Sequence, residues 1–183
     1  MGAFPSGQRG QTPNLKTSAL ALPYLRSEQN ISLFERHGIF TASEVISRCD
    51  IMLENFAKTV HIEALTMIDM VNREFLPAVT SYINTLADTA IKKQKLEIST
   101  QGYEKELAKR LSALSDKTFS ALSRLERAVS SAEKCKTPEE KALSYDRDVR
   151  RIMTEIRTYV DEMEKKTARE YWPHPTYTDM LYY

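Results

Sequence analysis

The sequence predicts an all-α fold, an antiparallel bundle of three long helices that follows a short helix and ends in an extended aromatic tail. Glycine is scarce, with 5 in 183 residues, and charged residues make up 28% of the chain. Abundant Ala, Leu, Glu and Lys favour helix. Apolar residues recur every three or four positions through three consecutive segments, and short turns separate these segments. This pattern is typical of helices that run up and down a bundle.

We expect three regions along the chain. Residues 1–22 read as coil or linker, because glycine and proline interrupt any regular element there. Residues 23–170 carry the helical bundle, and residues 171–183 form a docking tail. The bundle region opens with a short helix from Pro23 to His37, which Gly38 ends by adopting a left-handed conformation.

The second helix has the clearest start, because Thr41 and Glu44 have the spacing of a capping box. From there one apolar face comprises Val45, Cys49, Met52, Phe56, Val60, Ala64, Ile68, Val71, Phe75, Val79, Tyr82 and Leu86. Pro77 falls inside this pattern and should bend the helix, because proline removes one backbone hydrogen bond. We expect one long bent helix from Ala42 to about Ile98, with a full break at Pro77 as the alternative.

The third and fourth helices follow a turn over residues 99–102 and a turn at Cys135–Lys136. The third presents Tyr103, Leu107, Leu111, Leu114, Ala121, Leu125 and Val129 on one face. The fourth starts with Thr137 as N-cap, Pro138 at the first position and Glu140 at the third. Its apolar positions, spaced by three or four residues, are Ala142, Tyr145, Val149, Ile152, Ile156, Tyr159 and Met163. Across the bundle we expect core positions at Phe56, Leu65, Ile68, Phe75, Leu125, Ile156 and Tyr159.

Composition excludes several classes of partner. Lys and Arg total 26 against 25 Asp and Glu, so the net charge of +1 provides no field to attract nucleic acid or an anionic membrane. No glycine spacing fits a phosphate-binding loop. The longest apolar run, Ala19–Leu25, is too short to span a bilayer. We therefore expect no nucleic-acid and no membrane partner. The two unpaired cysteines, Cys49 and Cys135, indicate a reduced, cytoplasmic protein, with Cys49 a buried structural thiol.

The sequence predicts no catalytic, cofactor-binding or metal-binding residue. The fourth residue after His61 is Leu65, so a pair of histidine ligands one helical turn apart is missing. His37 suits the negative end of a helix, and His174 stands between two prolines. We expect all three histidines to be ordinary structural side chains.

Two carboxylates interrupt an apolar stretch of the second helix, at Glu63 and Asp69. Six residues of helix place them on different faces, which argues against a catalytic pair. Arg73 lies four residues after Asp69, so we expect an ion pair between these two side chains.

The C-terminal tail concentrates the only tryptophan of the chain with prolines and tyrosines. An exposed indole leaves a large apolar area in water, and proline stiffens the backbone that carries it. We therefore predict a docking element anchored by Trp172, Pro173, Pro175 and Tyr177.

Two segments carry a resemblance to a known family. Residues 53–70, which read Leu-Glu-Asn-Phe-Ala-Lys-Thr-Val-His-Ile-Glu-Ala-Leu-Thr-Met-Ile-Asp-Met, and the tail from Tyr171 to Leu181 resemble the C-terminal region of type III glutamine synthetases. Residues 33–41 and 75–79 are similar to the same family, and the likeness extends from Leu22 to Tyr182. The tail departs from the family pattern at His174, where an aromatic is expected, and at Thr178, where glycine is expected.

The resemblance implies a cytoplasmic ligase that makes glutamine from glutamate, ammonia and ATP with Mg or Mn, assembled as stacked hexameric rings. Its metal, ATP and glutamate sites would lie upstream, so no active-site residue can be assigned to this sequence. The helical region would then be inactive alone and would pack on the catalytic domain of the same enzyme and on neighbouring subunits. One alternative is a free-standing helical adaptor or coiled-coil interaction module. Another is an enzyme whose site is assembled from scattered side chains.

Overall fold

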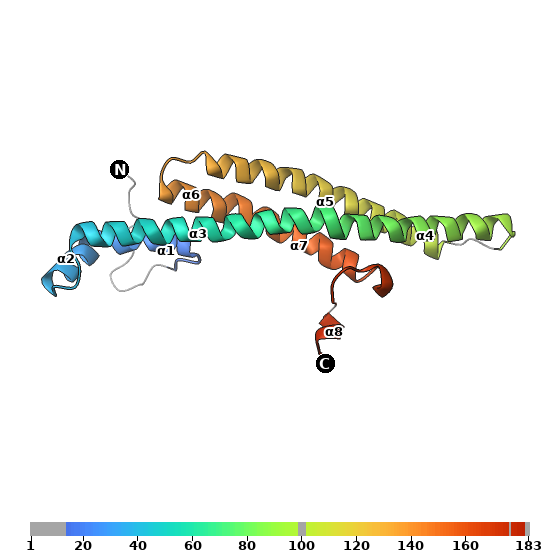
Figure 1. Ribbon diagram of the computed structural model, residues 1–183, viewed down its shortest axis with the longest axis horizontal. Helices are drawn as coiled ribbons and strands as arrows, with labels where there is room; N and C mark the ends of the chain where they lie inside the picture. The colour runs from blue at the N-terminus through green and yellow to red at the C-terminus, as the bar shows by residue number, and fades with distance from the viewer. Residues whose placement is uncertain (1–13, 99–101, 176, 182–183) are drawn as a thin grey trace.

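The computed structural model describes residues 14–98, 102–175 and 177–181, with the side chains of residues 177 and 178 left undescribed. Within those ranges the chain is helical and contains no strand. One long rod runs the whole length of the molecule, and two further helical segments pack along it (Figure 1). The N-terminal elements lie at one end of the rod, while the C-terminal tail leaves near its middle. The all-α bundle predicted from the sequence is confirmed.

The first described elements are shorter than expected. A helical turn, α1 (Ser18–Ala21), precedes a 3-10 turn, η1 (Leu22–Arg26), and α2 (Glu28–Arg36) follows. The predicted helix from Pro23 to His37 is therefore divided at Ser27, where the backbone is extended. The Ser27 hydroxyl oxygen caps α2 by accepting a hydrogen bond from the Asn30 amide. The expectation of coil over residues 1–22 is also wrong from Ser18 onward, because α1 begins there and Ala19 is fully buried. Residues 1–13 lie outside the described ranges.

The rod consists of α3 (Ala42–Met70), a π-helical turn η2 (Val71–Phe75) and α4 (Leu76–Lys95). Both hydrogen bonds of the predicted capping box are present at Thr41 and Glu44. The helix does not break at Pro77. Instead the helix contains one π-helical turn before the proline, in which the Leu76 amide donates to the carbonyl of Val71, five residues earlier. A π-turn lets the helix accommodate the missing amide of Pro77 and continue.

The chain then returns along the rod as α5 (Tyr103–Glu133), which packs between α4 and α7. Gly102 precedes α5 with a φ of +67°, a conformation that costs glycine little. The fourth predicted helix forms α6 (Pro138–Ser144), a second π-turn η3 (Tyr145–Val149) and α7 (Arg150–Glu164). The capping box at Thr137 and Glu140 is also present. The sequence analysis did not predict the π-turn at Tyr145.

The main core lies where α3, α4, α5 and α7 meet. Its fully buried members include Ala64, Val71, Val79, Leu111, Leu125, Tyr145 and Ile156. Phe56, Ile68, Phe75 and Tyr159 pack against this cluster and are only partly buried. Three predictions are wrong, because Leu65 and Met52 are each 47% exposed and Tyr103 is 67% exposed. The buried stripe of α3 instead passes through Leu53 and Ala57, one position beyond Met52 and Phe56.

A smaller core joins the N-terminal elements to the start of the rod. It comprises Ala19, Cys49, Leu53 and Ala142. The thiol of Cys49 is fully buried and donates to the carbonyl of Leu22 at 3.2 Å, which confirms its predicted structural role. Burial raises the pKa of this thiol above its ordinary value.

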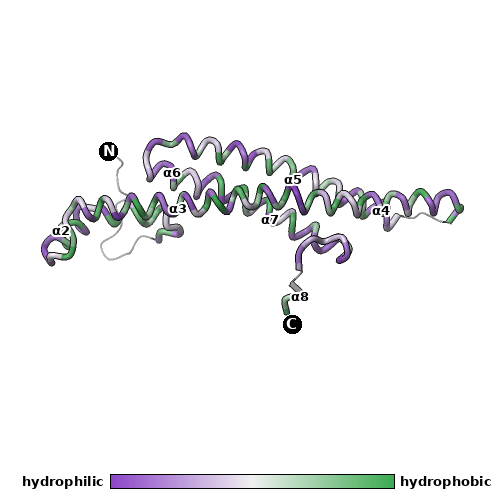
Figure 2. The backbone as a smooth tube through the Cα atoms, viewed as in Figure 1, coloured by the Kyte–Doolittle hydropathy of each residue, from purple (hydrophilic) through white to green (hydrophobic). Residues whose placement is uncertain are grey.

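The tail is less extended than predicted. A 3-10 turn, η4 (Arg169–Tyr171), follows α7, and a short helix, α8 (Tyr177–Leu181), points away from the bundle (Figure 1). Apolar and polar residues alternate along every long element (Figure 2). Accordingly, none of the helices in the described ranges is both long and apolar enough to cross a membrane.

Candidate functional site

An aromatic clamp fastens the tail to the rod. We use this name for Phe75, Tyr82, Tyr171, Trp172 and His174. The rings of Phe75 and Trp172 are stacked, with centroids 5.1 Å apart and planes at 21°. The His174 ring lies on the same Phe75, at 5.2 Å, and Tyr171 contacts Tyr82 at 5.1 Å. Phe75 therefore contacts two aromatic rings of the tail.

Polar contacts reinforce the clamp. The hydroxyls of Tyr171 and Thr85 are hydrogen-bonded at 2.9 Å, and His174 pairs through Nε2 with Glu74. Arg169 pairs with Asp179, which ties the start of the tail to α8. His174 was expected to be an ordinary side chain without a carboxylate beside it in sequence. Folding supplies Glu74 from the π-turn η2, a partner that the spacing along the chain does not reveal.

The four predicted tail anchors differ in environment. Trp172 is 9% exposed and belongs to the main core. Pro173 and Pro175 are exposed, so in this chain they shape the backbone and bury little area. The side chain of Tyr177 lies outside the described residues. The role of these four residues in docking to another surface stays a prediction.

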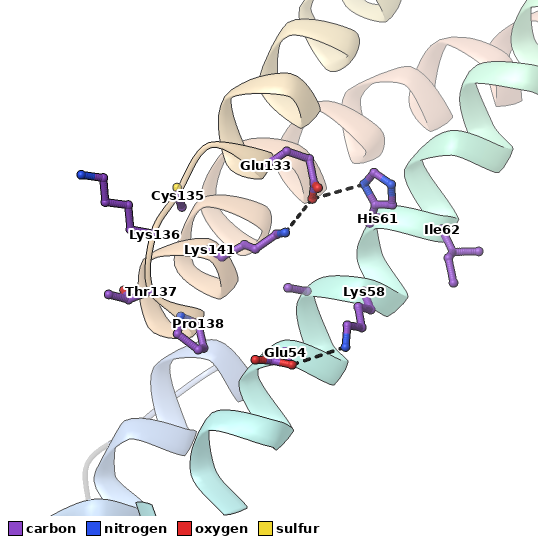
Figure 3. A pocket seen from close by; sticks show the side chains of 11 residues that line it. Glu54, Lys58, His61, Ile62, Glu133, Cys135, Lys136, Thr137, Pro138 and Lys141 are labelled. Carbon is purple, nitrogen blue, oxygen red and sulfur yellow. Dashed lines mark hydrogen bonds and ion pairs between the residues drawn. The ribbon is translucent and has the colours of Figure 1, made fainter. Parts of the chain in front are cut away.

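A second feature is a polar cluster, defined by His61, Glu133, Lys141 and Tyr145, which joins α3 to α5, α6 and η3. The Tyr145 hydroxyl donates to Glu133 Oε1 at 2.7 Å. An ionised carboxylate only accepts, so the Tyr145 oxygen accepts from His61 Nδ1, also at 2.7 Å. Lys141 Nζ lies 2.9 Å from the same Glu133 oxygen. The contacts of His61 and Lys141 with Glu133 are drawn in Figure 3.

The electrostatics of the cluster follow from these contacts. The hydrogen bond from Tyr145, followed by that from Lys141, lowers the pKa of the Glu133 carboxyl below its ordinary value. Burial, and then the neighbouring Glu133, raises the pKa of Tyr145 well above its ordinary value. Tyr145 therefore stays protonated and Glu133 ionised at neutral pH, which keeps the direction of each hydrogen bond fixed.

A cavity of about 610 Å³ opens beside the polar cluster, between α3 and the turn that joins α5 to α6. Lys58, His61 and Ile62 form one wall, and Glu133, Lys136 and Lys141 belong to the other (Figure 3). Cys135 also lines it and is partly exposed. The lining mixes paired charges with apolar carbon, which suits a protein side chain as well as a small molecule.

The remaining predicted residues are accounted for by ordinary contacts. Asp69 and Arg73 form the expected ion pair, at 3.3 Å. Glu63 is exposed on α3. In the part of the chain that the structure describes, no three His, Cys, Asp or Glu residues are grouped as metal ligands. Sequence reasoning missed the polar cluster, because 84 residues separate His61 from Tyr145 and no local pattern links them.

Comparisons with known proteins agree on one family. The sequence model described as the glutamine synthetase C-terminal domain matches residues 6–95. A glutamine synthetase from Butyrivibrio fibrisolvens is 37% identical over 171 residues, which cover 93% of this chain and 24% of the relative. One from Bacteroides fragilis is 28% identical, covering 97% and 25%. A type-3 glutamine synthetase from Dictyostelium discoideum is 25% identical, covering 92% and 24%. The chain thus spans about a quarter of the length of the curated relatives it matches.

Proposed function

This chain belongs to the glutamine synthetase family and corresponds to its C-terminal domain, as the resemblance to the type III enzymes indicated, and from that premise we propose that it supports a glutamate–ammonia ligase without supplying the active site. In this proposal the complete enzyme uses ATP to join ammonia to glutamate in the cytoplasm, and it assembles as a homo-oligomer. The helical domain holds the catalytic portion and its neighbours in place.

The observation that carries the proposal is the match itself. Nearly all of this chain aligns with the relative from Butyrivibrio fibrisolvens, yet it accounts for 24% of that protein. The C-terminal placement of the matching family leaves three quarters of the relatives' length to precede this domain. The side chains of the helical bundle are engaged in packing, capping and surface ion pairs, which are the interactions of a structural domain.

The cofactors implied by the family do not fit the residues described here. A Mg or Mn ion that carries ATP is held by one or two carboxylates together with the phosphates, so these carboxylates must be free of other partners. Glu133, Glu155 and Asp148 are each engaged by an arginine, lysine or tyrosine within the bundle. We derive no catalytic step from this domain and assign both cofactors to the preceding portion of the enzyme.

The proposal can be tested by exchange of domains. The glutamine synthetase from Butyrivibrio fibrisolvens would be produced with its own C-terminal quarter, without it, and with this chain in its place. We expect the exchanged enzyme to form γ-glutamyl product with ATP and to assemble as the parent does, and the truncated enzyme to lose both properties. The 183-residue chain alone should give no product.

Two results would contradict this division of roles. Product formation by the 183-residue chain alone would place an active site within the bundle. Full activity and assembly in the truncated enzyme would instead remove the supporting role and favour a free-standing adaptor module.

A further inference from the structure

The outer face of α3 is apolar at positions that nothing in the described structure covers. Ile51, Ile62 and Leu65 are 54%, 65% and 47% exposed. Eleven residues of α-helix make about three turns, so Ile51 and Ile62 lie within about 20° of each other, and Leu65 follows one turn later. These three residues, which we call the α3 outer stripe, extend over about 21 Å of the helix.

Lys58 lies between Ile51 and Ile62 on the same face, and the charges on and beside this stripe are already paired. Glu54 contacts Lys58, and Asp69 contacts Arg73, each at 3.3 Å and each along α3 or into η2. A partner that covers the stripe would leave no isolated charge behind, which removes the largest cost of burying such a face. Ile62 also borders the cavity beside the polar cluster, so the surface combines an apolar ridge with a hollow.

The start of the described chain is fastened next to the same cavity. The Thr17 hydroxyl donates to Asp146 in η3 at 2.8 Å. Arg26 pairs with Glu139 in α6 and with Asp50 in α3. Because α6 forms the second wall of the cavity, polypeptide that precedes this domain enters the bundle at the end where the hollow lies.

We propose that the α3 outer stripe and the adjoining cavity are the seat on which the preceding portion of the same polypeptide docks. The proposal rests on the function proposed above, in which that portion carries the catalytic site. An apolar side chain flanked by an acidic group would match the hollow, since Lys136 on its rim has no ion pair in the described residues.

The size of the surface favours a tethered partner. Freely associating proteins that form stable pairs bury about 800 Å² on each side. Three side chains and one hollow contribute only part of such an area, which is small for a second copy meeting this face from solution. A partner joined through the backbone is present at a high effective concentration, so a smaller contact suffices to hold it.

Photo-crosslinking in the complete enzyme tests the seat. p-Benzoyl-phenylalanine would replace Ile62 in one preparation and Phe119 in another, since Phe119 is 61% exposed on α5 and serves as the matched control. We expect position 62 to cross-link to peptides that precede this domain and position 119 to give no such product. Cross-links from position 62 only to helices of another copy, or none from it, would overturn the proposal.

A charge variant gives an independent measurement. Ile62→Glu should speed protease cleavage between this domain and the preceding polypeptide at least about tenfold, because separation of the two parts exposes the connection. Phe119→Glu should leave that rate unchanged, and equal rates in the two variants would contradict the docking.

Assays of glutamine formation on the same preparations separate the two claims. A protein that makes no glutamine refutes the proposed function, while the cross-links still report on the docking surface. An active protein without the expected cross-links refutes the docking surface alone.

Discussion

The two π-turns in the described part of the chain, η2 and η3, place aromatic side chains in different contacts, and they have different causes. At η2 the turn precedes Pro77, and Phe75 faces the tail, where Trp172 stacks on it. At η3 no proline is near, and the turn carries Tyr145 into the core, where its hydroxyl bonds to Glu133 and His61. One π-turn thus joins the rod to the end of the chain, and the other joins three helices.

The difference between the two turns shows that one backbone irregularity can have a local or a distant cause. Pro77 lacks an amide, so the helix must adjust near it whatever else it touches. Tyr145 could continue a regular helix, so we attribute the wider turn there to its part-buried hydrogen bonds with α3 and α5. A π-turn with a local cause should survive loss of its contacts, whereas one with a distant cause should not.

Removal of the indole should have the largest effect. Trp172→Ala in the 183-residue chain should lower the free energy of unfolding by about 3–5 kcal/mol, because a large buried ring is lost and a cavity remains. Chemical denaturation measures this change. Leu181→Ala is the control, because Leu181 is 78% exposed, and it should have no measurable effect. Equal stability of the two variants would show that the aromatic clamp adds nothing to the fold.

Loss of one hydroxyl at the other turn should cost less. Tyr145→Phe keeps the buried ring and should lower the free energy of unfolding by about 1–2 kcal/mol, because the bonds to Glu133 and His61 disappear. Ser120→Ala removes a hydroxyl from an exposed position of α5 and serves as the control. If both variants unfold at the same denaturant concentration, the polar cluster does not stabilise η3.

Replacement of the proline tests the local cause directly. Pro77→Ala restores an amide to the exposed side of the rod and should change the free energy of unfolding by at most about 1 kcal/mol. It should nevertheless shift the fluorescence of Trp172, because a regular helix would rotate Phe75 away from the indole. Pro173→Ala, at an exposed position of the tail, provides the comparison. Unchanged fluorescence in Pro77→Ala would mean that the clamp, and not the proline, holds η2 open.

Acid should weaken the polar cluster, with the smallest effect of the four. The pKa of Glu133 is lowered in the folded state by Tyr145 and then by Lys141. Its contribution to stability is therefore complete above the ordinary value of 4.5 and is lost as the pH falls through the lower folded pKa. Thermal unfolding should show a smaller loss between pH 6 and pH 3 in Glu133→Gln than in the parent chain. Glu126→Gln, at an exposed position of α5, should follow the parent, and matching profiles for all three would contradict the coupling.

The sequence was sufficient for features whose causes lie within a few residues. Both capping boxes, at Thr41 and Thr137, depend on a hydroxyl and a carboxylate three positions apart, and both are present. The π-turn before Pro77 and the ion pair of Asp69 with Arg73 also have local causes, although the sequence predicted a bend at the proline and not a π-turn. The family was also predicted from short segments, and the comparisons confirm it.

Features that depend on which faces meet could not be predicted from one sequence. Met52 has the right spacing for a core stripe, yet the buried stripe of α3 runs through Leu53 and Ala57 instead. Both choices satisfy helical periodicity, and only the position of the neighbouring helices decides between them. The same reason applies to the candidate sites. Trp172 was recognised as needing a partner, but Phe75, its partner, was predicted as a core residue of the rod.

The contrast between the two cysteines has a practical consequence for experiments on this protein. Cys49 is sealed in the small core and its thiol is hydrogen-bonded, so an alkylating dye should find little thiolate there. Cys135 is partly exposed at the mouth of the cavity. A thiol-reactive fluorescent dye should therefore label Cys135 selectively, without any mutation. The fluorescence of that label would report whether the cavity is open or filled.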